Sequence, residues 1–283
     1  MLHALGISPV DQSSQSKPRV TRGHYDANYN NFQTKLYEQL RRDAFGEDIG
    51  QNSWLTASEQ DQFKNWLRLA SGKRLLDVAC GAGGPALRLA ALTGTSVLGI
   101  DVHEQAVATA NALAAERGLT QTCEFRVVDA TQPLPLPDAS FDAITCIDAI
   151  NHLPDRRLVI SEWMRLLTPE GRLLFTDPIV VTGPLTNSEI AIRSSAGFYL
   201  LVPKGYDEEV LARCGLRLIT AENRTQNMAD IAHRRMQARE SHAEALREIE
   251  GAEVYEAQQQ FLTVASRVAQ EGRLSRFLFV AER

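Results

Sequence analysis

The chain has 283 residues, of which 44% are hydrophobic and 23% are charged, and its formal net charge at pH 7 is −5. This length allows one sizeable core with an appended cap, and the mild negative charge gives no reason to expect nucleic acid as a partner. The four cysteines lack paired spacing, which indicates reduced core residues of a cytoplasmic protein. No stretch is long and apolar enough to span a membrane, so we expect no membrane binding. The scattered cysteines are interpreted as core residues and not as ligands, and we expect no bound metal.

The first part of the chain divides into a tail and a helical segment. Residues 1–23 include a polar stretch rich in helix breakers, which predicts a flexible tail. Tyrosines and phenylalanines at roughly helical spacing follow, and Thr56 with Glu59 three residues later is typical of a helix N-terminus. Residues 24–72 are therefore predicted to form N-terminal helices that either pack on the core or close over a ligand.

A short apolar strand and a glycine-rich turn come next. Residues 75–79 predict a strand buried on both faces, as in a parallel sheet. Gly81, Gly83 and Gly84 end this strand, and Pro85 suits the first turn of a helix. Glycines at such a turn let a ligand lie directly against the backbone. The turn therefore predicts a site for either a dinucleotide or S-adenosylmethionine.

Acidic residues mark the ends of the next two predicted strands. Asp101 follows the strand at 97–100, where a carboxylate can accept hydrogen bonds from the two ribose hydroxyls of adenosine. Asp129 follows the strand at 124–128, where a carboxylate can accept from the adenine amino group. Either residue could instead cap the helix or turn that follows it. Asp129, together with Asp77 inside the first strand, favours S-adenosylmethionine over a dinucleotide.

The fourth predicted strand, at 141–147, ends in the run Asp148-Ala-Ile-Asn-His152. Ligands bind beyond the carboxyl ends of parallel strands, so these side chains should face the reactive end of the cofactor. His152 is the best placed of the six histidines for a general base, because the pKa of histidine lies near neutrality. It could alternatively pack against the following helix or hold Asp148. A fifth strand, at 172–176, brings Asp177 to the same edge.

The rest of the chain completes the predicted fold. Residues 73–180 form a cofactor-binding core, and residues 181–225 form the remainder of this core with a loop insertion. Two long helical patterns make residues 226–272 a helical cap insertion, and residues 273–283 form the final strand. We therefore predict an α/β fold with a doubly wound, mostly parallel, seven-stranded sheet and a helical cap.

Three arginines of the first cap helix have two interpretations. The simpler is that Arg234, Arg235 and Arg239 form a solvated face. Alternatively, one of them attracts an anionic substrate.

Residues 75–177 resemble the core of class I S-adenosylmethionine-dependent methyltransferases, with Asp77-x-x-Cys-Gly81-x-Gly83 at the place of that family's first motif. The run that contains His152 is similar to one in phosphoethanolamine N-methyltransferases and sugar O-methyltransferases, whose histidine is assigned to catalysis. Asp148 matches an acid of the first group, and Asp177 matches an acid of the second.

The resemblance implies methyl transfer from S-adenosylmethionine to nitrogen or oxygen of a small-molecule acceptor, with S-adenosylhomocysteine as product. It also implies a cytoplasmic enzyme, for which a homodimer is possible. Pro178 stands where the phosphoethanolamine enzymes carry a substrate-contacting tyrosine, which argues against that substrate. Two other functions stay open at this point, a nicotinamide-dependent oxidoreductase and a non-catalytic protein that binds S-adenosylmethionine.

The expected site residues form three groups. The catalytic group consists of His152, Asp148 and Asp177. The cofactor-binding group lies along the strand ends and in the N-terminal lid and consists of Asp77, Ala79, Gly81, Gly83, Asp101, Val102, Asp129, Ala130, Ile147, Gln51 and Trp54. The substrate-binding group is aromatic and consists of Tyr25, Tyr29, Phe198 and Tyr199.

Overall fold

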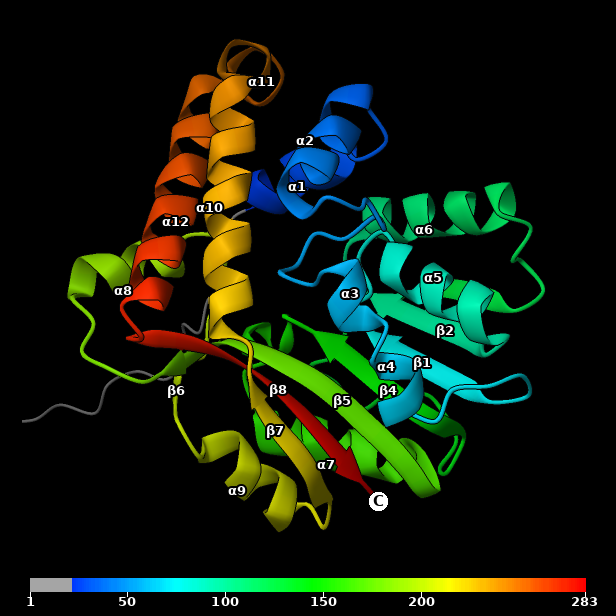
Figure 1. Ribbon diagram of the computed structural model, residues 1–283. Coiled ribbons are helices and arrows are strands. Elements are labelled where there is room, and N and C mark those ends of the chain that lie inside the picture. The colour runs from blue at the N-terminus through cyan, green and yellow to red at the C-terminus, as the bar shows by residue number, and fades with distance from the viewer. Residues whose placement is uncertain (1–21) are drawn as a thin grey trace, which may run out of the picture.

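A mixed sheet forms the centre of the protein in a computed structural model that describes residues 22–283 (Figure 1). Its eight strands in this part of the chain are β1 (Arg74–Val78), β2 (Ser96–Asp101), β3 (Cys123–Val127), β4 (Phe141–Ile147), β5 (Leu167–Val181), β6 (Val202–Pro203), β7 (Arg217–Asn223) and β8 (Leu274–Glu282). Their order is β3-β2-β1-β4-β5-β8-β7, and β6 pairs with β5 outside this path. Only β8 runs antiparallel to its neighbours, β5 and β7. The predicted α/β fold with a mostly parallel sheet is confirmed.

Helices cover both faces of the sheet and its carboxyl edge. They are α1 (Arg22–Asn30), α2 (Lys35–Phe45), α3 (Ala57–Gln60), α4 (Phe63–Trp66), α5 (Gly84–Thr93), α6 (Glu104–Glu116), α7 (Arg156–Leu166), α8 (Asn187–Arg193), α9 (Tyr206–Arg213), α10 (Thr225–Ser241), α11 (Ala243–Glu250) and α12 (Ala252–Gln270), with a 3₁₀ turn η1 (Ile150–His152). α7 and α9 pack on one face, whereas α4, α5 and α6 pack on the other. None of the described helices is both long and apolar enough to cross a membrane. The tail expected for residues 1–23 lies almost wholly outside the described residues.

β1 shows why the central strands are apolar throughout. Leu76 and Val78 are fully buried in the cluster beneath α7 and α9, and Leu75 is fully buried in the cluster beneath α5 and α6. Successive side chains of a strand point to opposite faces, so a strand covered on both sides has no polar face.

The N-terminus of α3 is also as predicted, because the Thr56 side chain accepts a hydrogen bond from the Glu59 backbone N–H.

The cap lies between the last two strands in sequence. It contains three helices, α10, α11 and α12, where the sequence predicts two helical patterns. The break comes at His242, and Gly251 with φ +86° then turns the chain into α12. α1 and α2 lie between this cap and α6 and so bridge the carboxyl edge of the sheet (Figure 1).

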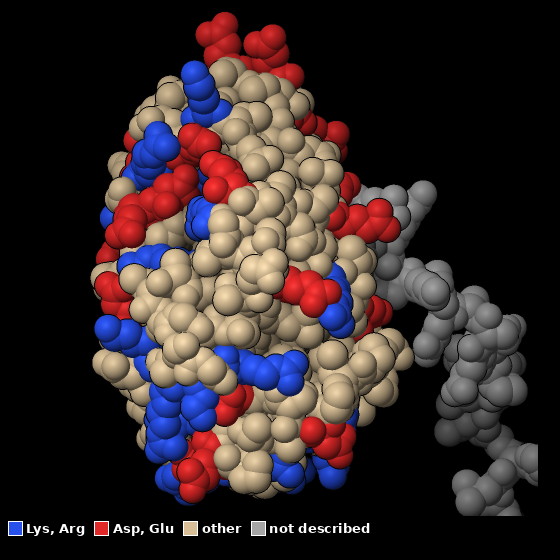
Figure 2. Space-filling model, turned by 90° about the vertical axis from the view of Figure 1, so that its right-hand side faces the viewer, with Lys and Arg blue, Asp and Glu red and all other residues tan. Residues whose placement is uncertain are grey.

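The surface has no dominant charge on the face shown in Figure 2, where acidic and basic side chains lie intermixed around a neutral centre. This mixture agrees with the small net charge of the sequence. The functional site is therefore identified from the buried groups rather than from a charged surface.

Candidate active site

Two of the glycines after β1, Gly81 and Gly84, meet different neighbours. A Cβ atom added to Gly81 would lie 2.8 Å from the hydroxyl oxygen of Tyr29, on α1. A Cβ atom on Gly84 would lie only 2.2 Å from the carbonyl oxygen of Ile49. Gly84 thus lets the N-terminal loop cross the start of α5, whereas Gly81, with φ +53°, leaves bare backbone beneath α1. Gly81 is therefore the position at which backbone without a side chain faces α1.

Two residues other than glycine adopt positive φ at the same edge. Ala79 has φ +56° and Asp148 has φ +54°. This conformation costs an L-residue about 1–2 kcal/mol, so the surrounding packing must impose it. Ala79 directs the end of β1 into the glycine turn, and Asp148 directs the end of β4 into η1.

Two buried carboxylates flank the glycine turn. Asp101 accepts hydrogen bonds from the backbone N–H groups of Gly81 and His103, each at 2.8 Å, which leaves its oxygens able to accept further bonds. Asp77 accepts from the Thr145 hydroxyl at 2.7 Å. Burial raises the pKa of Asp101, and it raises the pKa of Asp77 to about 7. Neither carboxylate has an ion-pair partner within residues 22–283, so a cationic ligand rich in hydroxyls suits this edge.

The residues expected around adenine lie at the ends of β2, β3 and β4. Asp129 is exposed, and its Oδ1 accepts from the backbone N–H and hydroxyl of Thr131. Val102 is 70% exposed, and Ile147 is half-buried. All three can reach a ligand at this edge.

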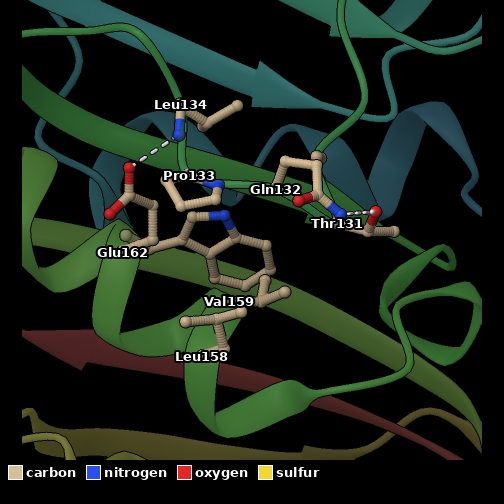
Figure 3. Close-up of a pocket in the computed structure, with 9 residues that line it drawn as sticks. Thr131, Gln132, Pro133, Leu134, Leu158, Val159 and Glu162 are labelled. Carbon is tan, nitrogen blue, oxygen red and sulfur yellow. Dashed lines mark hydrogen bonds between the residues drawn. The ribbon is translucent and has the colours of Figure 1, made fainter.

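Ala130 borders a small hollow between the loop after β3 and α7 (Figure 3). There Glu162 accepts a hydrogen bond from the Leu134 backbone N–H at 2.8 Å. The cavity volume is about 10 Å³, which is room for no more than one water molecule. The hollow is therefore too small to hold a nucleoside.

The side chains of Gln51 and Trp54 both bind to other parts of the protein itself. The Gln51 amide binds the backbone of its own loop, at the Ile49 N–H and the Glu47 carbonyl, and the residue is 2% exposed. The Trp54 ring stacks on Phe261 of α12, with ring centroids 6.4 Å apart. These contacts anchor the loop to the cap, which argues against the expected contacts with a cofactor.

His152 is the last residue of η1, and both of its ring nitrogens form hydrogen bonds. Nδ1 lies 2.9 Å from the Phe198 carbonyl oxygen, which can only accept, so Nδ1 carries the proton. Nε2 lies 2.9 Å from the Tyr25 hydroxyl and is then the acceptor. Burial, and after it the positive charge of Arg193, lower the pKa of His152 although the bond to Phe198 opposes them. The imidazole is therefore neutral near pH 7, with its lone pair directed at α1.

The four aromatic residues expected at the substrate site are divided between two places. Tyr25 and Tyr199 both contact His152, and the Tyr199 and His152 ring centroids are 4.7 Å apart. Tyr29 instead lies over the glycine turn, with its ring centroid 4.7 Å from that of His103. Phe198 supplies its carbonyl oxygen to His152, and its side chain is 43% exposed.

Asp148 does not have the free carboxylate that a catalytic role requires. Its oxygens accept hydrogen bonds from Trp54 N at 2.8 Å, Thr176 Oγ1 at 2.7 Å and Arg276 Nε at 2.7 Å. Arg276 also binds Glu59, so the three charged groups form one cluster. The catalytic role of Asp148 stays a prediction, and these contacts argue against it, because Asp148 joins the N-terminal loop, β5 and β8.

The contacts of Asp177 likewise argue against the catalytic role expected for it, which stays a prediction. Its side chain has no exposed surface and binds Arg156 Nη1 at 2.5 Å and the Ile179 backbone N–H at 3.0 Å. The same arginine binds Asp207 of α9. Because β5 continues past its predicted end to Val181, Asp177 lies inside the strand and beneath α9 instead of at the rim.

Sequence reasoning missed Arg193 and Arg276 and left two interpretations of Arg235. Arg193 was not singled out, and it is 2% exposed at the end of α8. Arg235 was interpreted as either a solvated residue or one that attracts an anionic substrate; it is only partly exposed and lies over the Trp54 ring. Arg276 could have been noticed as a charged residue in the apolar pattern of the final strand.

The comparisons with known proteins identify the core. Residues 76–175 match the family model described as "Methyltransferase domain". This part of the chain is therefore a methyltransferase domain, and the resemblance to class I S-adenosylmethionine-dependent methyltransferases is confirmed. The match favours S-adenosylmethionine over a nicotinamide dinucleotide at the glycine turn, because this turn lies in the matched domain.

Individual relatives cover different shares of the chain. The 27-O-demethylrifamycin SV methyltransferase of Amycolatopsis mediterranei is 35% identical over 158 residues, which are 53% of this chain and 56% of that protein. Phosphoethanolamine N-methyltransferase 3 of Arabidopsis thaliana is 31% identical over 202 residues, or 71% of this chain and 40% of that protein. The chain spans about half the length of the curated relatives it matches.

The fold extends further than this sequence similarity. The cyclopropane synthase MmaA2 from Mycobacterium tuberculosis has a TM-score of 0.79 at 20% identity, covering 95% of this chain and 100% of that one. At this identity the likeness concerns the fold alone. It includes the cap and the N-terminal helices, because nearly the whole chain is covered.

Proposed function

We propose that the protein binds S-adenosylmethionine at the carboxyl edge of the sheet and transfers its methyl group to nitrogen or oxygen of a small molecule. The single observation that carries this proposal is His152, a half-buried neutral base in a methyltransferase domain, which contacts the same helix, α1, that covers the glycine turn. The rifamycin and phosphoethanolamine relatives are named as methyltransferases of small molecules, which supports the same class of acceptor.

The residues around the glycine turn fit this cofactor. Gly81 presents backbone without a side chain beneath the Tyr29 hydroxyl, Asp101 keeps lone pairs for the ribose hydroxyls, and Asp129 is exposed for the adenine amino group. The buried carboxylate of Asp77 has no counter-ion in the described part of the chain, and the methionyl ammonium group can provide one. When bound, the cofactor supplies an electrophilic methyl group on a positively charged sulfur.

The helices α1 and α2 provide a lid in this proposal. Tyr29 reaches the glycine turn and Tyr25 reaches His152, so α1 spans the cofactor side and the acceptor side. Holding two reactants in line and excluding water is worth up to about 7–11 kcal/mol. The lid thus serves mainly to position the reactants.

His152 removes the proton that the acceptor must lose. In this structure the Tyr25 hydroxyl donates to Nε2 and so occupies the position of an acceptor O–H or N–H. The acceptor group takes over this hydrogen bond, and Nε2 accepts its proton. The Phe198 carbonyl holds the opposite nitrogen protonated, which fixes the tautomer that leaves Nε2 basic.

The test begins with binding and continues with turnover. Calorimetry should show saturable binding of S-adenosylhomocysteine and no binding of NADH. A small-molecule extract and a donor with a labelled methyl group then identify the acceptor. His152→Ala should lower kcat by about 10²–10⁴ with unchanged affinity for S-adenosylhomocysteine. His233→Ala, at an exposed position on α10, is the control.

Two results would contradict the proposal in different ways. Binding of NADH without S-adenosylhomocysteine removes the cofactor assignment. Binding of S-adenosylhomocysteine with turnover unaffected by His152→Ala removes the base, and binding without any label transfer favours the non-catalytic alternative.

A further inference from the structure

Arg193 is a buried cation that forms no ion pair with any of residues 22–283. Its Nε and Nη1 atoms are buried and have no hydrogen-bond partner in the described part of the chain. Its guanidinium carbon lies 4.5 Å from the centroid of the Phe261 ring. A buried guanidinium without hydrogen bonds destabilises a folded protein, and an aromatic face offsets this cost only in part. The chain therefore maintains an unfavourable group at this position.

Arg235 borders the same aromatic pair from α10. Its guanidinium carbon lies 5.3 Å from the centroid of Trp54, and Trp54 stacks on Phe261. Burial, followed by the charge of Arg239, lowers the pKa of Arg235 to about 10. Arg239 itself binds both carboxylate oxygens of Glu250, at 3.0 and 2.7 Å. Of these two neighbouring arginines, Arg239 is thus neutralised, whereas Arg235 forms no ion pair with a described residue.

Both arginines lie near tyrosines that contact the proposed base. Their charges act on Tyr25 and Tyr199, two of the residues that contact His152, and the charge of Arg193 also acts on His152. The carboxylates of Asp148 and Glu59 are bound to Arg276 and do not offset these cations. The acceptor side of the site therefore has two positive charges and unused N–H donors.

We propose that the methyl acceptor is an anion whose carboxylate or phosphate group binds to Arg193 and Arg235, with its nucleophilic atom at His152. An oxyanion supplies the acceptors that the guanidinium groups lack and neutralises their charge in a site of low dielectric constant. The aromatic pair beneath them excludes water and so strengthens the interaction. The inference rests on the proposed function for the reaction, but anion binding is measurable without turnover.

The binding test uses simple anions. With S-adenosylhomocysteine bound and ionic strength held constant, inorganic phosphate and acetate are titrated separately and followed by tryptophan fluorescence, since Trp54 contacts Arg235. At least one anion should bind saturably to the wild type. Arg193→Gln and Arg235→Gln should each weaken it about 10–100-fold, whereas Arg234→Gln, at an exposed position one residue away, should not.

The outcomes separate this inference from the proposed function. Normal binding of S-adenosylhomocysteine without saturable binding of either anion overturns the anion site and leaves the cofactor assignment intact. Equal weakening by Arg234→Gln also overturns it, because the effect is then one of overall charge. If S-adenosylhomocysteine fails to bind, the proposed function fails first.

A stability measurement tests whether Arg193 serves the fold instead. Replacing an uncompensated buried arginine by methionine should leave the melting temperature unchanged or raise it, while anion binding is lost. A lower melting temperature would overturn the proposal. A lower melting temperature of Asp11→Asn would also overturn it. This variant removes the one carboxylate of residues 1–21, so such a loss of stability would indicate an internal ion pair.

The labelled product distinguishes the two sources of charge. It should be retained on an anion exchanger at neutral pH, and phosphatase should release it if the group is a phosphate ester but not if it is a carboxylate. A labelled product that passes through the exchanger overturns the proposal.

Discussion

The protein contains two kinds of buried charge. In the clusters Arg156–Asp177–Asp207 and Arg276–Asp148–Glu59, each arginine binds two carboxylates and joins segments that are distant in sequence. Around the glycine turn and His152, by contrast, Asp77, Asp101, Arg193 and Arg235 have no ion-pair partner among the described residues. Paired charges fix the positions of the helices and strands, whereas unpaired buried charges destabilise the folded protein unless a bound ligand neutralises them. The comparison separates residues that build the site from residues that bind in it.

The largest expected effect comes from breaking a paired cluster. Arg276→Met leaves the Asp148 and Glu59 carboxylates buried without their cation, which should lower the free energy of unfolding by about 3–5 kcal/mol. Urea unfolding measures this loss. Arg68→Met is the control, since Arg68 is 54% exposed and pairs with Glu282 at 3.3 Å, and it should cost under about 1 kcal/mol. A loss of similar size in both variants would contradict the distinction.

Breaking a paired cluster should destabilise the protein, whereas replacing the unpaired Asp77 should stabilise it at high pH. Burial raises its pKa to about 7 from 3.8, so the folded state binds a proton that the unfolded state has released. The contribution of Asp77 to the free energy of unfolding is therefore lost as pH rises from about 4 to 7. This loss is at most about 4 kcal/mol, because the pKa shift spans about three pH units.

Urea unfolding at pH 5 and pH 8 measures this difference. Asp77→Asn keeps an acceptor for Thr145 and should remove this contribution, making the variant more stable than the wild type at pH 8. Asp129→Asn, at an exposed carboxylate, should leave the pH dependence unchanged. If Asp77→Asn were less stable than the wild type at pH 8, Asp77 would belong with the paired charges that stabilise the fold.

The smallest effect concerns binding. Asp101→Ala should weaken S-adenosylhomocysteine about 10–100-fold in calorimetry, because charged hydrogen bonds to the ribose are lost. Glu104→Ala, three residues along and exposed, should bind as the wild type does. Unchanged affinity in Asp101→Ala would leave this carboxylate the role of holding the Gly81 and His103 backbone N–H groups.

Local patterns in the sequence determined much of the fold. The apolar run at β1 is buried on both faces, and the glycines that follow it form a turn against which α1 and the N-terminal loop pack. His152 and Asp101 could be selected because the carboxyl ends of parallel strands meet at one edge, whatever the rest of the chain does. These features depend on residues close together in sequence, where periodicity and turn chemistry act.

Only the tertiary structure decided which charges are paired. Arg276 lies 128 residues from Asp148, and the two meet because β8 enters the sheet beside β5. Asp148 and Asp177 were therefore expected to be free, whereas partners supplied by distant segments bind both. Arg193 and Arg235 come from α8 and the cap, and no local pattern shows that they meet one aromatic pair. Hydrophobic periodicity is a property of neighbouring residues, but the electrostatic environment of a buried group is set by everything that folds around it.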